Sequence, residues 1–122
     1  MNSYKDLDVY KIVLTLFYEV HPASLLLPKY ELYELGSQLR RSSDSVVSNI
    51  VEGYGRKKYK AEFIRFLVFS HSSCIETKQH LEKINHLYKG LIPDNLKYID
   101  EYDILGAKLF TCIKYVEENW KT

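Results

Sequence analysis

The residues best suited to chemistry are positively charged side chains gathered around one expected turn. The whole chain is nearly neutral at +1, but residues 36–65 carry +4, whereas residues 1–35 carry −2 and residues 66–122 carry −1. Tyr54 and Tyr59 are interleaved with these cations. Cations bind phosphates and exposed aromatic rings stack on unpaired bases, so the pattern indicates a nucleic-acid contact. The predicted phosphate contacts are Arg40, Arg41, Arg56, Lys57, Lys58 and Lys60.

A plainer interpretation of the same cluster stays open. Helix ends and turns are commonly solvated, and cations are favourable near the C-terminal end of a helix because its dipole is negative there. On this interpretation the cluster binds nothing.

A second polar set follows helical spacing on one expected helix. At roughly 100° per residue, one arc of about 80° contains Gln38, Arg41, Ser45, Asn49 and Glu52. A similar polar stretch with small side chains occurs further along the chain, around Ser73. A solvent-facing stripe is the simplest explanation. The alternative is a network that holds helix packing or a subunit contact through Gln38, Ser45, Asn49, Glu52, Ser73 and Glu76.

Glu52 lies near the C-terminal end of its expected helix. The partial negative charge of the helix dipole disfavours a carboxylate at that position. We therefore expect Glu52 to have a cationic partner, which would be Arg41, Arg56 or an arginine of a neighbouring subunit.

Four-helix proteins often hold paired metal ions, but the spacing here does not fit such a site. Those sites need Glu-x-x-His on each of two helices and a glutamate on each of two others. Glu76 and His80 are four residues apart, as are Glu82 and His86, and both pairs lie on one expected helix. The sequence therefore predicts no metal site and no cofactor.

Catalytic motifs have equally little support. Ser70 and His71 are sequence neighbours that face different sides of a helix, and no G-x-S-x-G nucleophile elbow is present. Cys74 and Cys112 do not form C-x-x-C, so zinc and thioredoxin-type chemistry find no support. We expect both to be small apolar side chains kept reduced in the cytoplasm, and a disulfide between them is the alternative. We predict that the protein is not an enzyme.

Glycine and proline, which are scarce in this chain, mark the boundaries of the elements that position these residues. Glycine and proline together account for 8 of 122 residues, and the apolar residues between their breaks recur with helical period. Gly53 and Gly55 are interpreted as a helix end with a left-handed glycine. We predict a single all-α domain over residues 1–122, an antiparallel up-down-up-down four-helix bundle with helices near 5–20, 30–52, 59–89 and 93–120.

Two further features concern assembly and location. The segment Phe63–Phe69 is apolar almost all round, which favours burial against another subunit, although a thick contact within the bundle is the alternative. Asp6 and Asp8 lie where a secretion signal needs positive charge, and no stretch approaches a membrane span. We therefore expect a cytoplasmic homo-oligomer.

Several of these residues also carry a family resemblance. The stretch Gln38-Leu39-Arg40-Arg41, the core Asn49-Ile50-Val51-Glu52-Gly53, the opening Tyr4–Lys11 and the later Glu62–Leu67 together resemble the bacterial 23S ribosomal RNA intervening-sequence proteins. The resemblance spans nearly the whole chain. It implies a cytoplasmic four-helix protein that assembles as a homopentamer. A related group, the accessory proteins of diversity-generating retroelements, binds nucleic acid and a reverse transcriptase.

The sequence thus favours a non-enzymatic, homo-oligomeric helical bundle that accompanies nucleic acid, most naturally RNA. Possible partners are its own copies, RNA or DNA, and a reverse transcriptase or another protein. The alternative is a scaffold for protein–protein interaction that binds no nucleic acid.

Overall fold

The computed structural model describes residues 5 and 7–121, and every regular element in that part of the chain is helical. Tyr4 and Asp6, used above to interpret the N-terminal region, lie outside the described residues. The elements are α1 (Asp8–Ser24), the short 3-10 turn η2 (Lys29–Glu31), α2 (Leu35–Gly55), α3 (Lys60–Leu87) and α4 (Asn95–Asn119).

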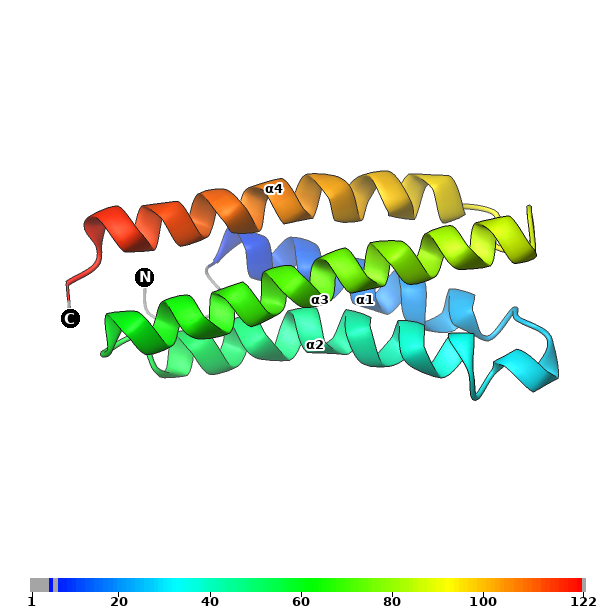
Figure 1. Cartoon of the computed structure of the whole chain (residues 1–122), viewed down its shortest axis with the longest axis horizontal. Coiled ribbons are helices and arrows are strands. Elements are labelled where there is room, and N and C mark those ends of the chain that lie inside the picture. Colours follow the sequence, from blue (N-terminus) through cyan, green and yellow to red (C-terminus); the bar gives the residue numbers. More distant parts are fainter. Residues whose placement is uncertain (1–4, 6, 122) are drawn as a thin grey trace.

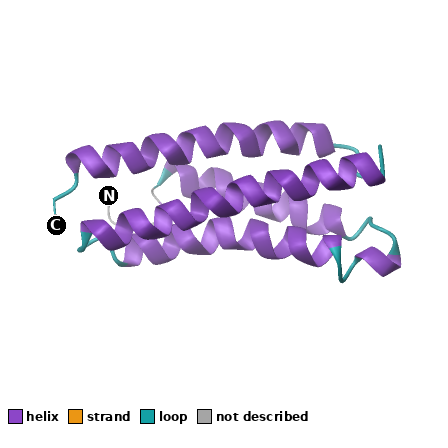
Figure 2. Ribbon diagram, in the orientation of Figure 1, coloured by secondary structure: helices purple, strands orange, loops and turns teal. Residues whose placement is uncertain are grey.

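Successive helices run in opposite directions along a common long axis, as Figures 1 and 2 show. α2 packs most extensively against α3 and α3 against α4, whereas α1 contacts α4 least. The all-α, up-down-up-down prediction is confirmed.

The core forms because each helix buries one apolar stripe along the bundle axis. Burial of such side chains supplies most of the favourable free energy of folding, at about 25 cal/mol per Å². The fully buried apolar side chains include Val13 and Val20 of α1, Leu39, Val46 and Ile50 of α2, Leu67, Leu81 and Ile84 of α3, and Leu105 and Leu109 of α4.

The first predicted helix ends four residues too early. α1 continues through Pro22 to Ser24, although proline cannot donate a helical hydrogen bond. Side-chain contacts hold the final turn, because the buried Ser24 hydroxyl donates to the His21 carbonyl at 2.6 Å and accepts from Nη1 of Arg40 at 2.9 Å. The connection that follows α1 therefore begins after Ser24, and within it the Leu27 side chain packs into the core.

The prediction of a left-handed glycine at the end of α2 is wrong. α2 runs through both Gly53 and Gly55, and among the described residues only Gly90 has a positive φ, of 81°. Gly53 is required for a different reason. A Cβ atom there would lie 3.0 Å from the Phe66 Cβ and 3.3 Å from the Phe63 carbonyl oxygen on α3.

The α2–α3 interface is narrow along its length, because small and hydroxyl-bearing residues line it. Gly53 is one point of close approach, and serines and a threonine continue the line away from it. Three hydroxyl hydrogen bonds cross the interface: Ser45 with Ser73 (2.8 Å), Thr77 with Ser42 (2.9 Å), and Ser70 with the Val46 carbonyl (2.7 Å).

None of the described helices is both long and apolar enough to cross a membrane.

The close approach at Gly53 predicts opposite effects for two neighbouring substitutions. Gly53→Ala inserts a methyl group against α3, and overpacking of about 1–3 kcal/mol outweighs a gain in helix propensity of up to about 1 kcal/mol. Gly55→Ala meets no atom within 4 Å, so it gains helix propensity without a clash. We expect the midpoint urea concentration of unfolding to be lower than that of the wild type for Gly53→Ala, and unchanged or higher for Gly55→Ala. Circular dichroism over a urea series measures both midpoints. Equal midpoints for the two variants would contradict the packing argument.

Candidate nucleic-acid interface

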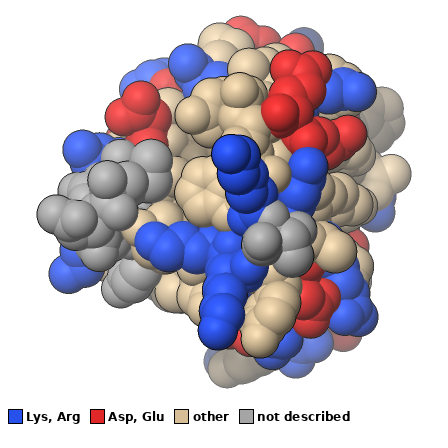
Figure 3. Space-filling view, turned by 90° about the vertical axis from the view of Figure 1, so that its left-hand side faces the viewer, with Lys and Arg blue, Asp and Glu red and all other residues tan. Residues whose placement is uncertain are grey.

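The basic turn, which we define as residues Arg56–Lys60, connects α2 to α3 at one end of the bundle. It is tight, because the Arg56 amide donates to the Gly53 carbonyl at 3.0 Å and the Tyr59 amide donates to the Arg56 carbonyl at 2.9 Å. Four cations therefore lie within five consecutive residues. Figure 3 looks onto this end of the molecule and shows lysine and arginine side chains gathered near the middle of the view.

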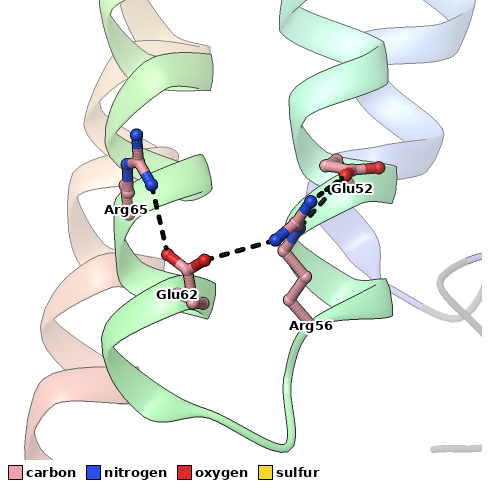
Figure 4. A network of polar contacts seen from close by, with 4 residues as sticks. All are labelled: Glu52, Arg56, Glu62 and Arg65. Atoms are coloured by element: carbon pink, nitrogen blue, oxygen red, sulfur yellow. Dashed lines mark hydrogen bonds and ion pairs between the residues drawn. The ribbon is translucent and has the colours of Figure 1, made fainter.

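Arg56 is the most heavily engaged of these cations. Its Nε and Nη2 atoms donate to Oε1 of Glu52 at 3.0 and 2.9 Å, and its Nη1 donates to Oε1 of Glu62 at 3.2 Å. Arg65 reaches the other oxygen of Glu62 at 3.5 Å, as Figure 4 shows. The hydrogen bond with Glu52 raises the pKa of the Arg56 guanidinium. The expected cationic partner of Glu52 is thus confirmed as Arg56, which links α2 to the first turn of α3.

Lys57 and Lys60 fasten the turn to the rest of the bundle. The Lys57 Nζ donates to the Tyr54 hydroxyl at 2.6 Å and lies 3.8 Å from the centre of that ring. The Lys60 Nζ donates to the Glu117 carbonyl near the end of α4. An ammonium group has three donors, so each lysine retains donors for a phosphate after these contacts.

Lys58 and Tyr59 project outward from the turn, and both are exposed. The Lys58 Nζ lies 5.8 Å from the centre of the Tyr59 ring, and 57% of Tyr59 is accessible. A charged group beside an exposed aromatic face is the combination that single-stranded nucleic acids bind, through phosphate contact and base stacking.

The six predicted phosphate-binding cations do not form one surface. Arg40 and Arg41 lie sixteen and fifteen residues before Arg56, which places them about 24 Å away along α2. Arg40 is half-buried and structural, because its Nη1 donates to the Ser24 hydroxyl at 2.9 Å and its Nη2 to the Leu32 carbonyl at 2.6 Å. Arg41 is exposed at that same distant end. We therefore leave Arg40 and Arg41 out of the interface.

The predicted polar stripe lies along the α2–α3 interface. Asn49 donates from its Nδ2 to both the hydroxyl and the carbonyl of Ser45 at 2.9 Å, and Ser45 shares a hydrogen bond with Ser73. These three half-buried residues hold helix packing within one chain. Gln38 and Glu76 are exposed beside them, and Glu52 belongs to the Arg56 network instead.

Trp120 was not among the predicted site residues, yet it anchors this end of the molecule. Its indole Nε1 donates to the Lys57 carbonyl at 2.8 Å, and its ring packs edge-on against Phe63 with centroids 5.2 Å apart. The available signal was that Trp120 is the sole tryptophan of the chain and ends the apolar stripe of the last helix.

The acid–histidine pairs considered for metal binding behave as ordinary side chains. Glu76 and His80 approach to 4.0 Å, and burial lowers the pKa of His80. Within the part of the chain that the structure describes, no three His, Cys, Asp or Glu residues gather as a metal ion would require.

Comparison with known proteins places this bundle in a family. No curated protein matched the sequence. A family model described as 23S rRNA-intervening sequence protein matches residues 5–110, which takes in α1, α2, α3, the basic turn and more than half of α4. The chain therefore belongs to the 23S rRNA-intervening sequence protein family.

Proposed function

We propose that this protein is a non-enzymatic, homo-oligomeric accessory that binds structured RNA or DNA through the basic turn. The observation that carries the proposal is that Lys57, Lys58 and Lys60 lie together with the exposed Tyr59 in one tight turn at the end of the bundle. Phosphate contacts supply most of the sequence-independent affinity of such proteins, and stacking adds to it.

The local balance of charge supports this choice of surface. Arg56 and Arg65 are paired with Glu52 and Glu62, so their charges are largely offset. The lysines contact a hydroxyl, a carbonyl oxygen or aromatic faces, none of which carries a negative charge. The positive charge of the three lysines is thus left to attract an anion.

Assembly into a ring, as a pentamer, forms the second part of the proposal. α3 exposes 44% of Val68, 41% of Phe69 and 57% of Ile75, and these residues share one side of the helix. Apolar side chains grouped on one helix face favour contact with another subunit. An oligomer would repeat the basic turn, and several weak phosphate sites on one particle bind a long nucleic acid far more tightly than one site.

A protein–protein scaffold remains the competing function, because the same apolar face of α3 could receive another protein. A pull-down that recovers one specific protein and is unaffected by nuclease would favour the scaffold. Loss of the recovered protein on nuclease treatment would favour the nucleic-acid function.

Reversal of charge at the turn should weaken nucleic-acid binding. Lys57→Glu with Lys58→Glu should lower the affinity for a structured RNA at least about tenfold at low salt and reduce the salt slope by about two. Filter binding over a salt series measures both quantities. The matched control is Lys83→Glu with Lys89→Glu, which makes the same change in net charge at two exposed positions, one in the last turns of α3 and one just after its end. Equal losses in the two double variants, or no binding by the wild type, would refute the proposed interface.

A charge on the exposed face of α3 should break the oligomer. We expect the wild type to sediment as a pentamer at micromolar concentration and Ile75→Asp to sediment as a smaller species, because burial of an unpaired carboxylate is costly. Thr15→Asp is the control, because Thr15 is exposed on α1, which makes no contact with α3. A monomeric wild type would refute the assembly proposal.

A further inference from the structure

A cavity of about 420 Å³ lies beside the basic turn, between the start of α1 and the last turns of α4. Its volume falls within the range of sites that bind small molecules or parts of larger ones. Of the helix pairs that pack against each other, the two that flank the cavity make the least extensive contact, so the opening lies along the most weakly packed side of the bundle.

Aromatic rings from three helices line the cavity: Tyr54, Phe63, Tyr115 and Trp120. Phe63 packs edge-on against both Trp120 and Tyr54, with centroids 5.2 and 6.4 Å apart, so these rings hold one another in place. A fixed aromatic wall is suited to a flat, unsaturated ligand, because π faces stack with little loss of side-chain freedom.

Polar groups at the cavity can contact the edge of such a ring. Lys108 lines the cavity, and Lys57 lies against Tyr54, one of its walls. Asp8 also lines it and can accept hydrogen bonds from an amino group. A donor, an acceptor and aromatic faces together match a nucleobase, which combines a polar ring edge with a π face, while Lys57 lies outside the cavity where a phosphate of the same strand could reach it.

The cavity is also connected to the basic turn through covalent and hydrogen-bonded contacts. Trp120 lines the cavity and holds the Lys57 carbonyl at 2.8 Å, and Tyr54 lines it and accepts from the Lys57 ammonium at 2.6 Å. A strand whose phosphates lie on the turn could therefore place one base in the cavity.

We propose that this cavity receives one unpaired base of the strand bound at the basic turn. The inference rests on the proposed function and adds a defined site for base stacking to it. The protein would then bind single-stranded loops or ends in preference to fully paired duplex, because only an unpaired base can leave its stack to enter.

Trp120 is the sole tryptophan, so its fluorescence reports directly on the cavity. A short single-stranded RNA oligonucleotide should quench this fluorescence with the same midpoint as its binding. A backbone of equal length with abasic sites supplies the phosphates without bases, so it should bind in a salt-dependent way without equivalent quenching. A free mononucleotide should quench only at much higher concentration, because it lacks the phosphates that the turn holds.

A second experiment fills the cavity with a larger side chain. Cys112 lines the cavity and is half-buried, so Cys112→Phe places a ring inside it. The affinity for the oligonucleotide should fall about tenfold or more, while the affinity for the abasic backbone should be unchanged. The matched control, Ala61→Phe, adds the same ring at an exposed position on the first turn of α3, outside the cavity. Circular dichroism checks that both variants fold.

The outcomes separate the two proposals. Equal quenching and equal affinity for normal and abasic strands would overturn the base site and leave the phosphate-binding function standing. Absence of binding by any strand at low salt would overturn both. Altered sedimentation of Cys112→Phe with unaltered strand binding would show that the cavity is a contact between copies of the chain and would overturn the base site.

Discussion

The close approach of α2 and α3 is the constraint on which the rest of the molecule depends. Gly53 leaves no room for a Cβ against α3, and the hydroxyl pairs from Ser42 to Thr77 continue the narrow interface away from it. Two helices that meet so closely near their connected ends need only a short link. The short link holds Arg56–Lys60 in one tight turn. The packing of α2 against α3 therefore keeps the cations of this turn close together at the end of the bundle.

The same packing separates cations that stabilise the fold from cations that face outward. Arg56 uses its planar, forked donors to join α2 to α3 through two carboxylates, a role that a lysine could not fill as well. Of the three lysines in the turn, Lys58 is the one that is exposed, whereas Lys57 and Lys60 each keep one contact to the bundle. Arginine is thus used to join separate segments of the bundle, at Arg40 and Arg56, through several donors at once.

Much of this was predictable from the sequence, because helical periodicity and scarce turn formers act locally. The four helices follow from spacing, the helix dipole predicted a cationic partner for Glu52 with Arg56 among three candidates, and a packing role for Ser45 and Asn49 was one of two interpretations. The failures arise where a residue serves a distant neighbour. A glycine required by a facing helix has the same local sequence as one that ends a helix, and the buried partners of Arg40 lie on other segments of the chain.

The unequal lengths of the helices explain why a cavity and a basic turn occur at the same end. α1 has 17 residues and begins at Asp8, whereas α4 has 25, so the last turns of α4 extend beyond the start of α1, as Figure 1 shows. The aromatic face of α4 there is covered less completely than the rest of the core. Incomplete burial forgoes about 25 cal/mol for every Å² left in water, and a stacked ring that covers this wall would recover it. A shorter first helix thus leaves this aromatic wall beside the cations open, and the base that we propose to bind there would cover it.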